Sequence, residues 1–249
     1  ILQAKLGLER SCMAMDINLG CSGWVYGLSV LSSLMQTGNI KKAILLAGDA
    51  RKQAKEELDQ LFGYACTATA LEYSKEAKPF YFDLGTDGTG YDAIIRPGGG
   101  CRNQFNEDSL KLELCEDGRK RHAIQTRMKG MDVFAFGITT APKSIKKLTA
   151  NYEMDYTSFD YVILHQANYK MTETIRKKLK LDAEKMPYSM LHFGNTSSAS
   201  IPLTIVTQLK GKIEDKPTKI IGCAFGVGLS WGTVAFETEH LLISELVEV

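Results

Sequence analysis

The chain has 249 residues, of which 44% are hydrophobic and 24% are charged, and its formal net charge is +1. This composition is ordinary for a globular protein, and a nearly neutral chain gives no indication of nucleic-acid binding. The longest apolar runs, such as residues 43–47, are far too short to cross a bilayer, so we expect no membrane insertion.

Six cysteines are spread along the chain. They have neither the paired spacing of a zinc site nor the density of a disulfide scaffold, so we expect free thiols in a cytoplasmic protein. The chain opens within what reads as the end of a helix, at residues 2–7. We interpret this opening as a sign that an N-terminal region of the protein is absent from the sequence.

In the first half of the chain, the pattern of apolar residues predicts strands and a helix. We expect a strand over 13–18, a helix over 22–37 that ends at Gly38, buried strands over 43–47 and 66–73, and an irregular surface insertion with a hairpin over 83–121. The helix is the clearest of these, because its apolar residues recur at nearly every third position.

The second half has a more regular order. We expect strands over 123–128, 161–165, 188–192, 220–224 and 233–237, and helices over 133–150, 169–180 and 199–209. Such alternation is typical of an α/β protein with a mainly parallel sheet.

A helix followed by two strands occurs twice at nearly the same spacing, once after Cys21 and once after Asn195. A weak internal repeat of this kind implies two similar halves. We therefore expect residues 1–121 to hold the remainder of an N-terminal half with its insertion, and residues 122–249 to form the C-terminal half.

The first candidate site is the segment 16–23, in which Cys21 stands where a strand leads into a long helix. Backbone N–H groups and the helix dipole stabilise a thiolate at such a position, so we expect a thiol pKa below the usual value of about 8.5. The neighbouring Gly20 and Gly23 permit a tight turn and close approach of a substrate. A buried structural cysteine is the alternative interpretation.

Two further candidates follow strands in the second half. His165 opens the run His-Gln-Ala-Asn at the end of a strand, where α/β folds usually place their sites. Asn195 lies in the run Gly-Asn-Thr-Ser-Ser-Ala-Ser at 194–200, directly before a helix. The alternatives are a structural histidine and a cluster of helix-capping side chains. Finally, the small residues at 224–232 form a tight turn whose backbone N–H groups fit an oxyanion hole, or equally a simple hairpin.

Together and in this order, the four segments resemble the β-ketoacyl-acyl carrier protein synthase III family of condensing enzymes, over residues 1 to 237. The resemblance implies a thiolase-like α/β/α/β/α layered fold of two similar halves, the first of them incomplete. It places the nucleophile on Cys21 and the two groups that handle the malonyl unit on His165 and Asn195. It also places an oxyanion hole at the backbone N–H groups of Cys21 and Val227.

The implied reaction loads an acyl primer on the cysteine and condenses it with malonyl-acyl carrier protein, with loss of CO2. The resemblance implies acyl-CoA and acyl carrier protein as partners, no cofactor or metal, and a cytoplasmic homodimer. Lys170, Lys177 and Lys178 match the family's basic positions for docking the acidic carrier protein. A solvated basic helix face is the alternative for these three residues.

Two other functions stay open at this point. The first is an acyltransferase of the same fold that moves the acyl group from Cys21 to another acceptor, and the second is an inactive partner subunit. The chain also departs from the family at 63–68, where Gly-Tyr-Ala-Cys-Thr-Ala stands in place of the usual Gly-Asp-Gly-Ala-Gly-Ala. The larger side chains there put substrate selection in doubt.

Overall fold

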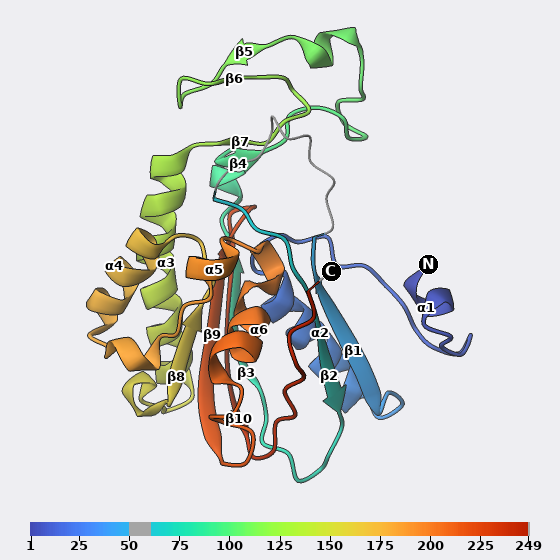
Figure 1. Cartoon of the computed structure of the whole chain (residues 1–249), viewed down its shortest axis with the longest axis vertical. Helices are drawn as coiled ribbons and strands as arrows, with labels where there is room; N and C mark the ends of the chain where they lie inside the picture. The colour runs from blue at the N-terminus through green and yellow to red at the C-terminus, as the bar shows by residue number, and fades with distance from the viewer. Residues whose placement is uncertain (50–60, 249) are drawn as a thin grey trace.

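The computed structural model describes residues 1–49 and 61–248. Figure 1 shows helices and sheets packed in layers, with a long insertion that projects at one end. The strands are β1 (Lys42–Gly48), β2 (Cys66–Glu72), β3 (Tyr81–Thr86), β4 (Ile94–Ile95), β5 (Glu113–Leu114), β6 (Lys120–Arg121), β7 (Arg127–Met128), β8 (Tyr161–Leu164), β9 (Thr218–Gly226) and β10 (Ser230–Thr238). The α-helices are α1 (Leu2–Lys5), α2 (Gly23–Gln36), α3 (Gly130–Asn151), α4 (Tyr169–Leu179), α5 (Met190–Phe193) and α6 (Ser200–Thr204). Short 3-10 turns are η2 (Gly88–Gly90), η3 (Glu107–Leu110), η4 (Tyr156–Ser158), η5 (Ala183–Lys185) and η6 (Ser197–Ala199), and η7 (Ile205–Leu209) is a π-helical turn.

The central sheet has the strand order β3-β10-β9-β8. Only β8 and β9 pair in parallel, whereas β10 pairs antiparallel with both β9 and β3. The prediction of a mainly parallel sheet is therefore wrong. The reason lies in the short turn between β9 and β10, because a connection of a few residues can join only antiparallel neighbours.

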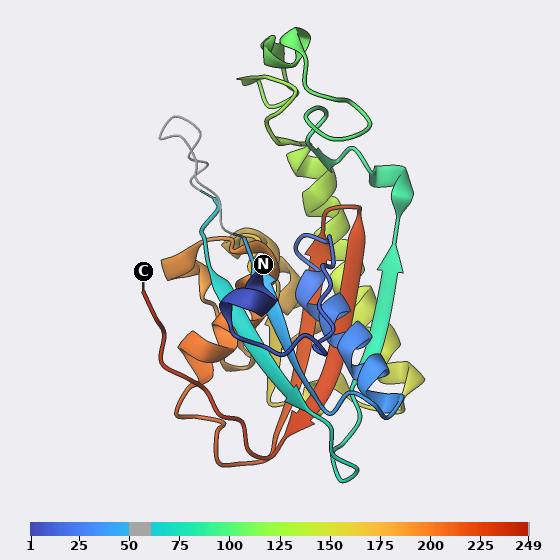
Figure 2. The same ribbon diagram turned by 90° about the vertical axis from the view of Figure 1, so that its right-hand side faces the viewer.

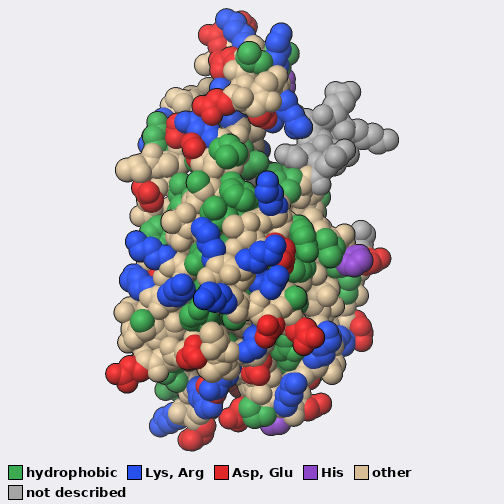
Figure 3. All heavy atoms as spheres, turned by 90° about the vertical axis from the view of Figure 1, so that its left-hand side faces the viewer, with side chains coloured by type: hydrophobic (Ala, Val, Ile, Leu, Met, Phe, Trp, Pro, Cys, Tyr) green, Lys and Arg blue, Asp and Glu red, His purple; other side chains and the backbone are tan. Residues whose placement is uncertain are grey.

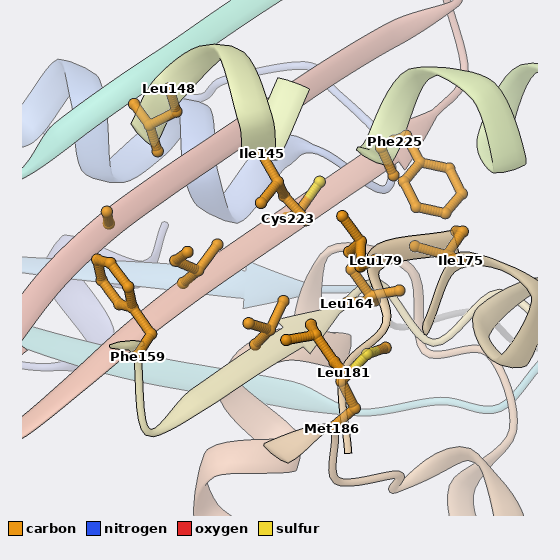
Figure 4. Close-up of a cluster of buried hydrophobic side chains, with 14 of the residues drawn as sticks. Ile145, Leu148, Phe159, Leu164, Ile175, Leu179, Leu181, Met186, Cys223 and Phe225 are labelled. Carbon is orange, nitrogen blue, oxygen red and sulfur yellow. The ribbon is translucent and has the colours of Figure 1, made fainter. Parts of the chain in front are cut away.

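Strand β9 separates two hydrophobic cores. Ile221, Cys223 and Phe225 face α3 and α4, where they join the buried cluster drawn in Figure 4. Ile220 and Ala224 face the other way and pack in the cluster formed with α2 and α6. This alternation follows from the two-residue period of a strand, and each large buried side chain contributes about 1.5–3 kcal/mol.

The layers follow from these contacts. α3 and α4 cover one face of the central sheet, and α2 and α6 cover the other. On its far side α2 packs against β1, which forms a separate antiparallel pair with β2 (Figure 2). The order is therefore helices, sheet, helices, sheet, as expected of a layered α/β fold.

The predictions that β1 and β2 are buried strands are wrong, since residues in both alternate between exposed and at least partly buried. In β1 the alternate residues Ile44 and Leu46 are 54% and 47% exposed on the outer face of the β1–β2 pair. The intervening Leu45 faces inward and lies so close to Gly27 of α2 that a Cβ atom at Gly27 would be 2.5 Å from Leu45 Cδ1. An apolar run alone does not distinguish a strand buried on both faces from one buried on a single face.

Several predicted elements are confirmed and others are not. The helices expected over 22–37, 133–150 and 169–180 correspond to α2, α3 and α4, and the expected strand pair at the C-terminal end corresponds to β9 and β10. The surface hairpin is also confirmed, as the pairing of β5 with β6.

Four further expectations fail. Residues 13–18 form no strand, only the last two residues of 123–128 do so, and the strand expected at 188–192 is replaced by α5. The start of the expected irregular insertion is instead β3, which pairs with β10.

Within residues 1–49 and 61–248, none of the helices has the length and apolar character needed to cross a lipid bilayer.

Candidate active site

Cys21 lies directly before the N-terminus of α2, as the sequence predicts. Its side chain rests against Gly226 at the end of β9, where a Cβ atom would be only 2.8 Å from the Cys21 sulfur. The turn that follows is held to the helix by side chains. Ser22, the N-cap of α2, shares a 2.7 Å hydrogen bond with the hydroxyl of Ser230, which also donates to the Val227 carbonyl at 2.7 Å.

The electrostatics of Cys21 differ from expectation. Desolvation by burial raises the pKa of the thiol, and this effect outweighs the hydrogen bonds from the Ser197 side chain and from the backbone of Val227 and of Cys21 itself, which lower it. The predicted lowering of the pKa is therefore wrong, because the helix N-terminus does not compensate for the lost solvent. At neutral pH the resting group is a thiol, with two backbone N–H groups close to its sulfur.

His165 stands at the end of β8 and is 2% exposed. Its backbone N–H donates to the Cys223 carbonyl at 2.8 Å, and its ring meets the Phe225 ring edge-on with centroids 5.8 Å apart. The Nδ1 atom shares a 2.8 Å hydrogen bond with the hydroxyl of Ser200. Burial lowers the pKa of His165 to about 4, so the imidazole is neutral at physiological pH.

Asn195 is also buried, and its neighbours fix it from two sides. Its backbone N–H donates to the Leu61 carbonyl at 2.9 Å, and its carbonyl accepts from the Gly63 N–H at 3.0 Å. This pairing requires a glycine at 63, where a Cβ atom would lie 1.8 Å from the Phe193 carbonyl oxygen. The side-chain Oδ1 accepts from the Ser197 N–H at 2.9 Å, so the amide NH2 group is free of that contact and able to donate.

Ser197 is the residue at which the three predicted groups meet. Its hydroxyl hydrogen-bonds to Cys21, its backbone to the His165 ring, and its N–H to the Asn195 side chain. Its backbone φ of 53° lies in the left-handed region that few residues other than glycine adopt. The structure thus brings Cys21, His165 and Asn195 into one site, although their catalytic roles stay predictions.

Three residues of this site were missed in the sequence: Ser197, Ser200 and Gly226. The serines lie in the Gly-Asn-Thr-Ser-Ser-Ala-Ser run, where the capping alternative applies to every hydroxyl alike. The structure shows no side-chain cap at the start of η6 or of α6. Ser200 could have been identified only if the first residue of α6 had been known, and sequence patterns do not define helix ends to one residue.

The other members of the His-Gln-Ala-Asn run have structural contacts. Gln166 is fully buried, donates to the Leu164 carbonyl at 2.8 Å and accepts from the Ser189 N–H at 3.0 Å, which holds the segment before α5 in place. Asn168 is the N-cap of α4 and accepts from the Met171 N–H at 2.9 Å. The hydrogen bonds of Gln166 and Asn168 therefore hold the loop that follows His165 in position.

Figure 3 shows the side of the molecule on which α3 and α4 lie in Figure 1, and several Lys and Arg side chains gather on it. Lys170, Lys177 and Lys178 are exposed, and Lys178 donates to the Ile138 carbonyl at 3.0 Å. Glu173, the acidic residue of this helix, is paired with Arg176 and accepts from a tyrosine hydroxyl, which together hold its pKa at about 2. The carboxylate of Glu173 therefore pairs with Arg176 and forms no ion pair with Lys170, Lys177 or Lys178.

Among the described residues no group of three or more His, Cys, Asp or Glu side chains could hold a metal ion. All six cysteines lie in that part of the chain and are free thiols.

Comparisons with known proteins cover both segments of the site. Residues 15–88 match the family model of 3-oxoacyl-[acyl-carrier-protein] synthase III, and residues 149–238 match the model of its C-terminal part. The chain is 30% identical over 241 residues to the beta-ketoacyl-[acyl-carrier-protein] synthase III of Clostridium acetobutylicum, which covers 95% of this chain and 71% of that protein. It is 32% identical over 238 residues to the protein of the same description from Synechocystis sp., with 92% and 68% covered.

Solved structures agree with this assignment. A crystal structure of 3-oxoacyl-(acyl-carrier protein) synthase from Burkholderia xenovorans LB400 superimposes with a TM-score of 0.88 at 35% identity, over 100% of this chain and 70% of that chain. The predicted thiolase-like α/β fold is thereby confirmed. The chain belongs to the 3-oxoacyl-[acyl-carrier-protein] synthase III family of condensing enzymes.

Proposed function

We propose that this chain transfers an acyl primer from acyl-CoA to Cys21 and condenses it with malonyl-acyl carrier protein, releasing CO2 and a 3-oxoacyl product. The observation that carries this proposal is the meeting of Cys21, His165 and Asn195 around Ser197. The proposed steps use a thiol and neutral hydrogen-bond donors, so they require neither a metal nor an organic cofactor.

In the first step, the sulfur of Cys21 attacks the thioester carbonyl of acyl-CoA. The C–S bond to CoA breaks, and the thiol proton leaves with the CoA sulfur, so that free CoA departs and a new thioester remains on Cys21. Negative charge develops on the carbonyl oxygen during the attack. The backbone N–H groups of Cys21 and Val227 point toward the sulfur, which supports their role as donors to the oxygen of the carbonyl group that bonds to this sulfur.

In the second step, the malonyl carboxylate leaves as CO2 and its electrons move to the thioester oxygen. That oxygen needs donors that stabilise charge without protonating the carbon that must react. The neutral imidazole of His165 and the amide NH2 of Asn195 meet this need. The enolate carbon then bonds to the acyl carbonyl carbon, and the sulfur of Cys21 leaves as a thiolate that takes up a proton from solvent to restore the thiol.

We further propose that the carrier protein docks on α4 through Lys170, Lys177 and Lys178, and that two copies of the chain act together in the cytoplasm. The exposed lysines and the ion pair that neutralises Glu173 support the docking surface, because they leave a net positive helix face. Family membership supports the dimer and the compartment.

Intact mass spectrometry tests the reaction directly. After incubation with an acyl-CoA we expect one acyl adduct, which Cys21→Ala abolishes and Cys101→Ala, at an exposed cysteine, leaves in place. Addition of malonyl-carrier protein should then release CO2. An adduct without CO2 release would favour transfer to another acceptor, and no adduct at all would favour an inactive partner subunit.

The division of labour is tested by His165→Ala and Asn195→Ala. Each should slow CO2 release by about a hundredfold or more, as for other oxyanion donors, and leave the adduct on Cys21 intact. Loss of the adduct before any loss of CO2 release would contradict the proposed roles.

A further inference from the structure

The contact between His165 and Ser200 has a consequence for the chemistry of the ring. Both side chains are almost fully buried, at 2% and 1% exposed, and their Nδ1 and Oγ atoms are 2.8 Å apart. A neutral imidazole carries its proton on one nitrogen only, so this hydrogen bond and the tautomer of His165 determine each other.

We propose that Ser200 is a positioning residue that donates its hydroxyl proton to Nδ1 and thereby holds His165 as the Nε2–H tautomer. This inference rests on the proposed function, in which the ring must donate a hydrogen bond to the enolate oxygen. A ring protonated on Nδ1 would instead present the lone pair of Nε2 to that negative oxygen and repel it.

The direction of the hydrogen bond follows from the surroundings of Ser200. Within the described part of the chain, Nδ1 is the one side-chain or backbone group that bonds the Ser200 hydroxyl. If Nδ1–H donated instead, the serine proton would have no acceptor in a buried site, at a cost that disfavours this arrangement. If the serine donates, the proton is satisfied and Nδ1 is its acceptor.

Other contacts hold both partners rigid. The carbonyl of Ser200 accepts from the Thr204 hydroxyl at 2.7 Å, and that hydroxyl lies 2.7 Å from the Ser189 hydroxyl. The ring of His165 rests edge-on against Phe225. These contacts hold the backbone of Ser200 and one edge of the ring, so the Ser200 hydroxyl and Nδ1 lie within hydrogen-bond distance before any substrate binds.

NMR of the full chain with 15N-labelled histidine tests the tautomer. Long-range 1H–15N correlations distinguish a protonated ring nitrogen from a bare one, and His165→Asn identifies the signals of His165. In the wild type we expect a proton on Nε2 and a bare Nδ1. A proton on Nδ1 would overturn the proposal, and this result does not depend on any activity measurement.

Ser200→Ala tests the role of the hydroxyl. We expect signals of both tautomers and CO2 release from malonyl-carrier protein that is about tenfold slower, with acylation of Cys21 within about twofold of the wild type. Ser144→Ala is the matched control, because it removes a buried hydroxyl that bonds Asp83 and Thr233 and contacts neither Ser200 nor the ring.

The outcomes separate the two proposals. A folded Ser200→Ala variant that keeps a single Nε2–H tautomer and the wild-type rate would sink the positioning role. If His165→Asn itself left CO2 release unchanged, the proposed function would fail, whatever the tautomer. If Ser200→Ala did not fold, the wild-type spectrum alone would still decide the tautomer.

Discussion

A single methyl group added at Gly226 should displace the side chain of Cys21 and so slow its acylation. In Gly226→Ala the new Cβ atom would stand 2.8 Å from both the Cβ and the Sγ atoms of Cys21. Carbon atoms in contact are about 3.5–4.0 Å apart, so the cysteine side chain or the end of β9 must retreat by about 1 Å. The backbone of Gly226 is not in the left-handed region, so the effect is steric and not conformational.

The expected result is a large kinetic effect with a moderate loss of stability. Displacing a reacting group by about 1 Å costs about a hundredfold in rate, so acylation of Cys21 should slow by about that factor. Overpacking of this kind costs about 1–3 kcal/mol in the free energy of unfolding. The adduct is followed over time by intact mass, and urea unfolding measures the stability.

Gly100→Ala is the matched control, because nothing lies within 4 Å of a Cβ atom at that position. It should acylate at the wild-type rate. If folded Gly226→Ala also acylated at the wild-type rate, the close approach of β9 to the nucleophile would have no part in placing the sulfur, and the reasoning would be refuted.

Two further predictions concern charge. Burial lowers the pKa of His165 from 6.5 to about 4, so between these pH values the unfolded chain binds more protons than the folded chain. The free energy of unfolding should therefore fall by about 2 kcal/mol between about pH 7 and pH 5 through this residue. Urea unfolding of His165→Asn should lack this part of the slope, and an identical slope would contradict the buried neutral ring. At low salt, Lys170→Glu with Lys177→Glu should raise the KM for malonyl-carrier protein several-fold, whereas the same charge change in Lys75→Glu with Lys216→Glu should not. If both double variants changed the KM by the same factor, the lysines of α4 would have no specific part in docking the carrier protein.

The sequence predicts the positions of Cys21 and His165 at the ends of their elements better than it predicts the sheets. Cys21 and His165 could be found because each stands where a regular element begins or ends, and both α2 and β8 have clear apolar patterns. The segment 188–192 was misassigned because five residues with a tyrosine and two apolar side chains suit a short strand as well as one turn of helix. Its helical form depends on Gln166, which binds the N–H groups of Ser189 and Met190 and lies far away in the sequence.

The thiol pKa of Cys21 could not be predicted for a related reason. A helix N-terminus is visible in the sequence, but the burial that raises the pKa of the thiol arises only in the folded chain, where Gly226 of β9 lies against the sulfur. The hydrogen bonds from Ser197 and Val227, which lower the pKa, also form only there and do not offset this burial. Likewise, the left-handed backbone of Ser197 has no local signal, since the sequence carries serine and not glycine there. Burial and strain of this kind are properties of the tertiary packing.

Strand β9 links the nucleophile to the histidine mechanically. The Cys223 carbonyl accepts the backbone N–H of His165, and Gly226, on the same extended segment, lies against Cys21. Residues 223–226 of β9 thus contact both Cys21 and His165, and a substitution that displaces this short segment should be felt at both residues together.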